Sequence, residues 1–426
     1  MIVSLNTFMG QFIIQGGAKL KGEVEISGMK NAATPIIAAT LLTEEECLID
    51  NVPRITDVEK MLDILKSLGS KVNWLGEHQL SIKNDSLNLA ALEKKMVKSM
   101  RSSVLLLAPL LVRFQEALVP EPGGCIIGNR PLDTHFFVLQ KLGAEIKQEK
   151  DFFHLKTIGL IGAKIILPEM SVTATENAIM ASVLAKGDTV ISLAAAEPHV
   201  QDLCNFLIKM GAQIEGVGTH TLKIKGVKKL HGAEHTLIPD QIEIGTLAVA
   251  AAATHGEVSI HPVISEHLEK ILSVLTAIGV AWDINGSTLQ IHHSHPLKSF
   301  KLQTLPFPGF PTDLQAPFGV LATQCQGTTL IHDPMYEGRL GYINELIKMG
   351  ANAVVCDPHR VLITGPTPLY GQEIKSFDLR AGATLVIAGI LAEGETIINE
   401  AEMVFRGYEA IDEKLRKLGV EIEYKK

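Results

Sequence analysis

The chain has 426 residues, of which 46% are hydrophobic and 20% charged, and it carries a formal net charge of −8 at pH 7. This length predicts two or more domains with substantial cores, and the composition shows no bias towards disorder. The acidic balance argues against nucleic acid or an anionic membrane as the main partner, because both require a basic face.

The N-terminal stretch "MIVSLNTFMGQFIIQGG" lacks the basic start and the long apolar core of a signal peptide. No apolar run approaches the roughly 18 to 20 residues that span a bilayer. No pair of cysteines has CxxC spacing, which favours a reducing compartment and argues against a zinc knuckle or a redox dithiol. We therefore expect a cytoplasmic protein without a membrane partner. Three cysteines lie in helical or strand patterns and are expected to be buried: Cys204, Cys325 and Cys356.

A repeated pattern organises the predicted elements along the chain. Six helical segments, from "LKSLGSKVNW" to "LRKLGVEIEY", each end in a glycine that is followed by a strand-like run. Each glycine suits the left-handed position that ends a helix, and the alternation after it predicts a strand. These glycines are Gly69, Gly143, Gly211, Gly279, Gly350 and Gly419.

A second, alanine-rich helix is predicted in each repeat, as in "LAVAAAATHGEVSI" and "LVIAGILAEGETIINE". These helices have almost no polar face, so we expect them to be buried. A strand and then a loop follow each of them. If the equivalent loops of a pseudo-symmetric fold converge, five of their residues share one neighbourhood: Arg54, Cys125, Glu197, Arg339 and Arg406.

The loop "VPEPGGCIIGNRPLD" (residues 119–133) holds Cys125 among glycines and prolines. Such loops are flexible and often present chemistry on a rigid scaffold. From the residues alone, Cys125 is a reactive thiol, half of a disulfide, a metal ligand or part of an inert turn.

Several basic residues stand beside Gly, Pro or an apolar helix, where a scaffold does not require them. Taken singly, each is typical of a solvated surface charge, and an aspartate such as Asp313 in "FPTDLQA" is typical of a helix N-cap. Together they predict a pocket for a small, multiply charged anion, since helix N-termini and arginine forks favour phosphate and carboxylate. The six are Lys30, Arg101, Arg130, Arg339, Arg380 and Arg406.

The repeat and the motifs "SGMKNAA", "PGGCIIGNRPLDTH", "FPTDLQA", "DLRAGA" and "RGYE" together resemble one family from about residue 10 to the C-terminus. The family is that of the enolpyruvyl transferases which act as UDP-N-acetylglucosamine 1-carboxyvinyltransferases. The resemblance implies an α/β fold, a two-domain inverse α/β barrel of six βαβαββ repeats with three in each domain. It implies one domain over residues 30–238, a second formed by residues 1–29 plus 239–426, and an active site in the cleft between them.

The resemblance also implies the reaction. The enolpyruvyl group of phosphoenolpyruvate is transferred to the 3′-hydroxyl of UDP-N-acetylglucosamine and phosphate is released, which is the first committed step of peptidoglycan precursor synthesis. It implies no metal and no organic cofactor, and it leaves the oligomeric state open. Cys125 matches the family's thiol, a general acid that forms covalent adducts, so fosfomycin, an epoxide phosphonate, should alkylate it.

Further roles come from the resemblance alone. Asp313 matches the base at the sugar hydroxyl, and Lys30, Arg130 and Arg406 match the grip on phosphate, with Lys30 and Arg406 counted as catalytic. The remaining predicted substrate-binding residues are Asn31, Arg101, Pro131, Leu132, Asp133, His135, Ser171, Val172, Glu197, Asp240, Met335, Arg339, Asp378 and Arg380.

The chain departs from the family's usual pattern at three positions. Thr56 stands where some members carry lysine, so one phosphate contact is either absent or supplied by Arg54. Glu169 occupies a position that is often basic, and Thr173 replaces a frequent glycine. Two alternatives stay open: a shikimate 3-phosphate enolpyruvyl transferase, which shares the repeat but lacks the cysteine loop, and a non-catalytic paralogue that binds UDP-sugars.

Overall fold

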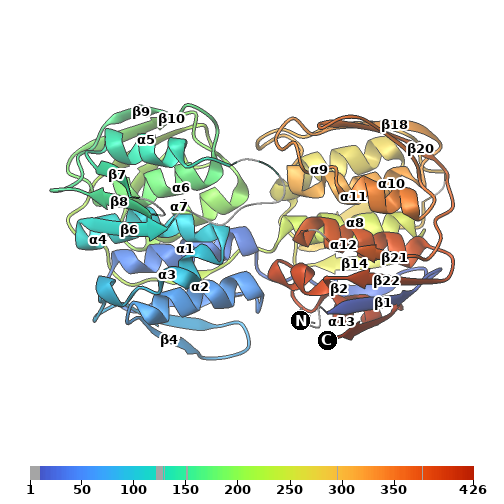
Figure 1. Ribbon diagram of the computed structural model, residues 1–426, viewed down its shortest axis with the longest axis horizontal. Coiled ribbons are helices and arrows are strands. Elements are labelled where there is room, and N and C mark those ends of the chain that lie inside the picture. Colours follow the sequence, from blue (N-terminus) through green and yellow to red (C-terminus); the bar gives the residue numbers. More distant parts are fainter. Residues whose placement is uncertain (1–9, 121–127, 129, 150–151, 295, 377) are drawn as a thin grey trace, which may run out of the picture.

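The structure is a computed structural model that describes residues 10–120, 128, 130–149, 152–294, 296–376 and 378–426. Two lobes lie side by side, and each contains three sheets with their helices (Figure 1). The predicted α/β architecture of six repeats is confirmed by these sheets. We propose that the lobes correspond to domains of residues 30–238 and of residues 1–29 plus 239–426.

The first lobe holds α1 to α7 and three sheets. Its first sheet has the order β13-β3-β5-β4. The strands are β3 (Cys47–Asp50), β4 (Lys71–Trp74), β5 (Leu80–Lys83) and β13 (Glu234–Thr236), and the adjoining helices are α1 (Lys30–Ala39), α2 (Thr56–Ser67) and α3 (Lys94–Lys98). The second sheet has the order β6-β8-β7 in the described part of the chain. Its strands are β6 (Glu116–Pro120), β7 (Glu145–Glu149) and β8 (Phe152–Lys156), and its helices are α4 (Leu107–Phe114) and α5 (Asp133–Lys141). The third sheet has the order β11-β12-β10-β9. Its strands are β9 (Lys164–Ile166), β10 (Asp188–Ser192), β11 (Gln213–Glu215) and β12 (Thr221–Lys225), and its helices are α6 (Val172–Ser182) and α7 (Pro198–Lys209).

The second lobe repeats this plan with α8 to α13. Its first sheet, β15-β16-β14-β2, comprises β2 (Lys21–Glu25), β14 (Glu257–His261), β15 (Trp282–Asn285), β16 (Thr288–Ile291), α8 (Gln241–Ala253) and α9 (Ser265–Ile278). The next, β17-β18-β20-β19, comprises β17 (Lys301–Gln303), β18 (Gly327–His332), β19 (Asn352–Asp357), β20 (Arg360–Gly365), α10 (Gln315–Ala322) and α11 (Tyr342–Lys348). The last, β21-β22-β1-β23, comprises β1 (Gln11–Gln15), β21 (Glu373–Lys375), β22 (Glu395–Asn399), β23 (Glu421–Lys425), α12 (Leu379–Leu391) and α13 (Ile411–Lys417).

The N-terminal strand β1 completes the last sheet of the chain. It pairs antiparallel with both β22 and β23, so that Phe12 lies opposite Ile398 on one side and Tyr424 on the other. The rings of Phe12 and Tyr424 are 5.4 Å apart, centroid to centroid. The two ends of the described chain are therefore held together in one sheet.

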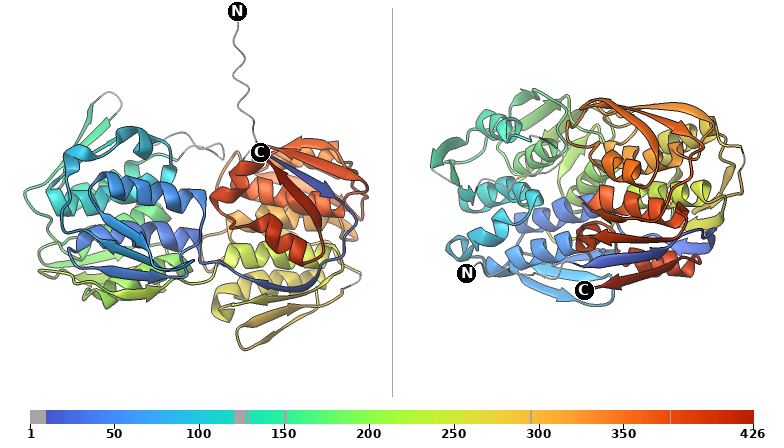
Figure 2. Two further views of the ribbon diagram at one scale, coloured as in Figure 1. Left: turned by 90° about the horizontal axis from the view of Figure 1, so that it is seen from below. Right: turned by 45° about the vertical axis from the view of Figure 1, so that its right-hand side comes forward.

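The alanine-rich helices form the centre of each lobe, and the sheets lie towards its outside (Figure 2). In the second lobe α8, α10 and α12 pack against one another, and every residue of α8 is buried. Gly245 allows this closeness, because a Cβ there would lie 2.5 Å from the Leu314 side chain. The prediction of buried alanine-rich helices is thus confirmed.

The predicted helix-ending glycines are also confirmed. All six repeat glycines have φ between +93° and +102°. This left-handed conformation is strained for a residue with a Cβ, which explains why the same residue type recurs at each helix end.

Two extended segments cross between the lobes next to each other. The N–H of Met29 donates to the carbonyl of Ile238 at 2.8 Å, and the N–H of Asp240 donates to the carbonyl of Ser27 at 3.0 Å. These bonds join the only two crossings that the described residues make, next to the cavity described below, whose wall includes Met29 and Gln241.

The described cysteines divide into buried and exposed thiols. Cys204 and Cys325 are fully buried as predicted, and burial raises the pKa of each thiol to about 12. The prediction for Cys356 is wrong, since this thiol is exposed. It lies on the edge strand β19, where the pairing with β20 shifts register between Val355 and Asp357. Separately, none of the helices in the described part of the chain is long and apolar enough to cross a membrane.

Candidate active site

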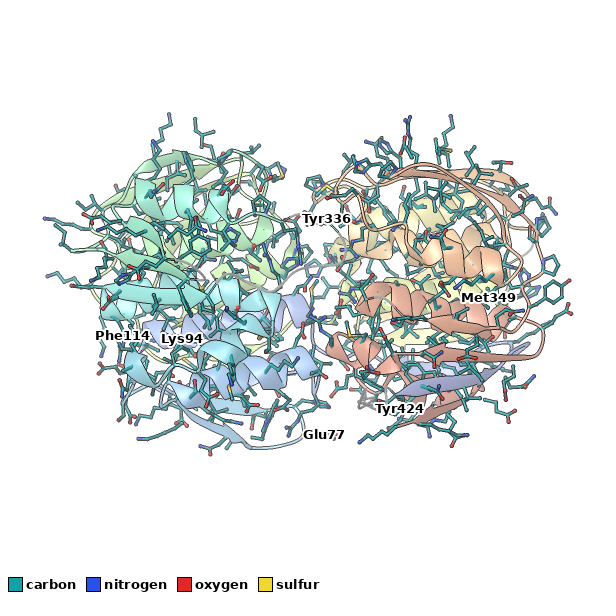
Figure 3. All side chains as sticks on the ribbon, viewed as in Figure 1. Glu77, Lys94, Phe114, Tyr336, Met349 and Tyr424 are labelled. Atoms are coloured by element: carbon teal, nitrogen blue, oxygen red, sulfur yellow. The ribbon has the colours of Figure 1, made fainter. Side chains whose placement is uncertain are left out.

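A cavity of about 830 Å³ lies where the two lobes meet. Its wall takes in the starts of α1, α6 and α12, the 3₁₀ segment Arg101–Leu106, and residues 305–313. A volume of this size suits a small-molecule ligand. Tyr336 marks its rim between the lobes (Figure 3).

Most of the predicted site residues reach this cavity, although they come from segments far apart in the chain. Those that line it are Lys30, Asn31, Arg101, Arg130, Pro131, His135, Ser171, Val172, Glu197, Asp313, Met335, Arg339, Asp378, Arg380 and Arg406. Three residues of the equivalent loops, Glu197, Arg339 and Arg406, meet at the cavity as the predicted convergence of these loops requires. Cys125 lies outside the described residues.

Three predicted residues are not part of the cavity wall. Leu132 is buried in the hydrophobic core, and Asp133 is exposed at the first position of α5. Asp240 is buried as the N-cap of α8, where Oδ1 accepts hydrogen bonds from the N–H groups of Ile242 and Glu243. Substrate binding by these three stays a prediction.

Asp313 is held between two arginines. Its Oδ1 accepts a hydrogen bond from Nη2 of Arg339 at 2.6 Å, and its Oδ2 accepts one from Nε of Arg380 at 3.1 Å. Burial alone would raise the pKa of this carboxyl, but the charges of Arg339 and Arg380 outweigh it and lower the pKa well below its usual range. Asp313 is therefore ionised.

Asp57 makes a second bridge of the same kind. Its Oδ2 lies 2.9 Å from Nζ of Lys30, and its Oδ1 accepts a hydrogen bond from Nε of Arg406 at 3.0 Å. Only 1% of Asp57 is exposed; burial opposes ionisation, but Lys30 and Arg406 lower its pKa. Asp57 belongs to α2 of the first lobe and Arg406 comes from the second, so this bridge also joins the lobes.

Asp57 is a site residue that the sequence reasoning missed, and Arg54, three residues before it, is one that it misplaced. The guanidinium carbon of Arg54 lies 3.3 Å from the Trp74 ring centroid, and its Nε donates to the carbonyl of Glu77. Arg54 is exposed and does not line the cavity. Thr56 is exposed and also lies outside the lining, so neither of these two residues supplies the missing phosphate contact. The loop sequence offers one signal for Asp57, an acid in the first turn of an amphipathic helix.

The N-terminus of α12 is satisfied in a different way from the expected one. Oδ1 of Asp378 accepts hydrogen bonds from the N–H groups of Arg380 at 2.8 Å and Ala381 at 3.1 Å, and it thereby caps α12. The expectation that the start of α12 itself favours an anion is therefore wrong, because its first N–H groups already have a carboxylate partner. Asp378 instead fixes the turn from which Arg380 enters the cavity.

Another part of the cavity wall carries two arginines and a neutral histidine. Arg101 donates to the carbonyl of Arg130, whose guanidinium carbon lies 5.7 Å from the Tyr336 ring centroid. His135 Nε2 is 2.8 Å from Oγ1 of Thr173, and burial followed by the charge of Arg101 lowers the pKa of His135 to about 3. The predicted departures Glu169 and Thr173 both line this wall.

A third group of side chains lines the cavity without cationic partners. Glu176 in α6 is buried and Glu197 before α7 is partly buried, and burial raises the pKa of each carboxyl. His199 is also buried, which lowers its pKa to about 4 and keeps its ring neutral. The sequence reasoning missed Glu176 and His199, because a single carboxyl in an apolar helix carries no periodic or motif signal.

Chemically, the cavity joins a strongly cationic part to a part with neutral polar groups. The first can bind phosphate and carboxylate groups together, since two carboxylates already occupy its cations and can share them with a ligand. Asp313 can accept a hydrogen bond from a ligand hydroxyl, because it is ionised and faces the cavity.

Comparison with known proteins agrees with this class of site. The model of the family "EPSP synthase (3-phosphoshikimate 1-carboxyvinyltransferase)" matches residues 14–415. Among solved structures, the enolpyruvyl transferase NikO from Streptomyces tendae superposes with a TM-score of 0.89 at 25% identity, covering 98% of this chain and 99% of that one. EPSP synthase from Acinetobacter baumannii has the same fold, with a TM-score of 0.74 at 20% identity over 98% of this chain and all of that one. The fold and the site are those of an enolpyruvyl transferase.

Relatives of closer sequence define the family further. The UDP-N-acetylglucosamine 1-carboxyvinyltransferase of Treponema denticola is 42% identical, covering 98% of this chain and 100% of that protein. The protein of the same name from Koribacter versatilis is 44% identical, covering 97% and 96%. The chain belongs to the UDP-N-acetylglucosamine 1-carboxyvinyltransferase family.

Proposed function

We propose that this enzyme transfers the enolpyruvyl group of phosphoenolpyruvate to the 3′-hydroxyl of UDP-N-acetylglucosamine and releases phosphate. It acts in the cytoplasm, on two small-molecule substrates, in peptidoglycan precursor synthesis. The observation that carries the proposal is a cavity with two aspartate-bridged cation pairs, Lys30–Asp57–Arg406 and Arg339–Asp313–Arg380, in a chain of this family.

The charges of the cavity suit the charges of the substrates. Phosphoenolpyruvate carries a phosphate and a carboxylate, and the sugar nucleotide carries a diphosphate. The six predicted basic residues all line the cavity, although the chain as a whole is acidic. Such a concentration of cations in a partly enclosed site binds anions far more strongly than an exposed surface does.

The reaction proceeds by addition and elimination. In the addition, the 3′-hydroxyl oxygen bonds to C2 of phosphoenolpyruvate, the hydroxyl proton passes to a base, and a proton is delivered to the methylene carbon. In the elimination, the new methyl group loses a proton, the carbon–carbon double bond re-forms, and phosphate leaves. The cations stabilise the phosphate as its charge grows.

Asp313 is proposed as the group that accepts the hydroxyl proton. Because Arg339 and Arg380 lower its pKa, Asp313 is ionised but weakly basic. It therefore orients the hydroxyl first, and it takes the proton once carbon–oxygen bond formation has made that hydroxyl acidic. Lys30 and Arg406 hold the phosphate, exchanging part of their contact with Asp57 for contact with the substrate.

Cys125 is proposed as the acid that protonates the methylene carbon, on the strength of its motif. The buried thiols Cys47, Cys204 and Cys325 are poor competitors, because burial raises their pKa to between about 11 and 12. Fosfomycin should therefore alkylate Cys125, and a Cys125→Asp variant should keep turnover but lose sensitivity to the epoxide.

Phosphate release from phosphoenolpyruvate tests the proposal directly. We expect release with UDP-N-acetylglucosamine, none with shikimate 3-phosphate, and inhibition by fosfomycin with one added mass on the peptide that contains Cys125. Absence of release with UDP-N-acetylglucosamine would leave the non-catalytic alternative. An adduct on exposed Cys356 in place of Cys125 would refute the role given to the thiol.

A further inference from the structure

Several buried side-chain atoms of the cavity wall have no hydrogen-bond partner in the described part of the chain. Three of them belong to two carboxyl groups without a Lys or Arg partner and to the histidine that follows: Oε1 of Glu176, Oε2 of Glu197 and Nδ1 of His199. Buried polar atoms in native proteins are nearly always paired, and unpaired ones cost free energy. Their position in a cavity wall therefore points to a bound ligand that completes them.

Glu176 is the most isolated of these groups. Only 1% of it is exposed, and its Oε1 has no hydrogen-bond partner among the described residues. It lies on α6 one turn beyond Val172 and Thr173, which line the cavity together with Ser171. Burial and the neighbouring charge of Glu197 raise its pKa, which favours the protonated form of the carboxyl.

Glu197 stands beside it at the junction of the lobes. Its Oε1 accepts a hydrogen bond from the N–H of Phe307 at 3.3 Å, which belongs to the second lobe, and its Oε2 is left without a partner. His199 follows two residues later and presents a neutral ring to the same cavity. These groups form a polar wall that, unlike the Asp57 and Asp313 bridges, contains no Lys or Arg partner.

We propose that Glu176, together with Glu197, forms a subsite that binds the uncharged polar groups of the acceptor sugar, so that Glu176 is a specificity-determining residue. This rests on the proposed function, because it takes the acceptor to be a sugar nucleotide. A protonated carboxyl offers one O–H donor and one carbonyl acceptor, the pair that a hydroxyl or an acetamido group can satisfy. Phosphate and carboxylate groups gain nothing there and bind the cations on the other side.

Two substitutions of Glu176 separate this role from a structural one. Glu176→Gln keeps a neutral donor and acceptor of the same shape, whereas Glu176→Leu removes both. Ser182→Ala is the matched control, because Ser182 lies on the same helix, is fully buried and also has an unpartnered hydroxyl, but does not line the cavity. Calorimetric titration of each full-length variant with UDP-N-acetylglucosamine and with UDP measures the contribution of the sugar alone.

We expect Glu176→Leu to bind UDP-N-acetylglucosamine about tenfold more weakly than the wild type, the loss of one or two neutral hydrogen bonds, with UDP affinity within about twofold. Glu176→Gln and Ser182→Ala should bind both ligands as the wild type does. The melting temperature of Glu176→Leu should stay the same or rise, because an unpaired buried carboxyl has been removed.

Wild-type affinity of Glu176→Leu for UDP-N-acetylglucosamine would overturn the inference. So would equal losses for UDP and UDP-N-acetylglucosamine with a lower melting temperature, the result of a purely structural role. A wild-type chain that neither binds UDP-N-acetylglucosamine nor releases phosphate would overturn the proposed function and this inference with it. Wild-type turnover with unaltered binding by Glu176→Leu would overturn the inference alone.

Discussion

Two regions of one cavity hold buried carboxyl groups in opposite states. Asp57 and Asp313 each bridge two cations, and their pKa values are lowered; Glu176 and Glu197 have no cationic partner, and their pKa values are raised. Burial raises the pKa in all four cases, so burial does not explain the difference. The neighbouring guanidinium and ammonium groups do.

The difference assigns a task to each region. Where carboxylates neutralise cations, an incoming phosphate or carboxylate can take over part of their contacts, so the region is prepared for anions. Where carboxyl groups with raised pKa values stand without a cation, an anion finds no partner but a hydroxyl or amide does. Four changes would break or sharpen this contrast.

The largest effect is expected from Asp313→Asn. It leaves Arg339 and Arg380 buried with one carboxylate fewer, which should lower the free energy of unfolding by about 3 kcal/mol, as for other broken buried pairs. Turnover should fall by roughly 10³-fold or more, because the proton acceptor is lost. Urea denaturation and phosphate-release rates measure the two effects.

Glu176→Gln is the comparison, since it removes a carboxyl of the same cavity that is buried but has no cation. At neutral pH it should leave the free energy of unfolding unchanged or raised. A loss as large as that of Asp313→Asn would show that the two regions do not differ as described.

The next effect concerns Arg406→Met. Asp57 keeps its contact with Lys30 in this variant, so the free energy of unfolding should change by less than about 1 kcal/mol. Turnover should fall by roughly 10²- to 10³-fold, because one cation that stabilises the departing phosphate is absent. Comparable losses of stability and turnover would make Arg406 a structural residue.

A third prediction concerns how stability depends on pH, which tests the raised pKa of Glu176. Burial, followed by the charge of Glu197, raises this pKa above its ordinary value of 4.5, so the folded chain keeps a proton that the unfolded chain releases. The free energy of unfolding of the wild type should therefore fall, relative to Glu176→Gln, as the pH rises above about 4.5, by up to about 1.4 kcal/mol per pH unit. The difference stops growing once the raised pKa is passed.

Urea denaturation of both chains between about pH 5 and pH 8 checks this sign. Parallel stability curves over that interval would mean that Glu176 ionises normally.

The smallest effect is expected from Arg54→Ala. Arg54 is exposed, and the variant loses its stacking on Trp74, its bond to the carbonyl of Glu77 and its exposed ion pair with Glu59, together about 0.5 to 1 kcal/mol of stability. Turnover should stay at the wild-type value, as measured by phosphate release. A fall of tenfold or more would place Arg54 in the anion site after all.

The residue types in each segment were sufficient to predict the repeated helices and strands. Gly69 and its five equivalents end helices because a left-handed residue is needed there, and alanine-rich helices must be buried because they have no polar face. The cations of the site were also visible, since six basic residues beside glycines, prolines and apolar helices stand out in an acidic chain.

The residues that were misplaced or missed from the sequence also share a physical reason. Arg54 and Asp57 are only three residues apart, before α2 and in its first turn, and only packing against the second lobe decides that Asp57 faces Arg406 while Arg54 turns to Trp74. Cys356 has a strand pattern that gives no sign of an edge position.

The sequence by itself therefore determined the repeated α/β architecture, the family and the cationic character of the site, because each depends on residue types and on spacing along the chain. The tertiary structure alone decided which carboxyls are charged. Asp57 meets Arg406 and Asp313 meets Arg380 across long stretches of chain, and Glu176 meets no cation. An ionisation state depends on such neighbours in space, and these appear only when the lobes are assembled.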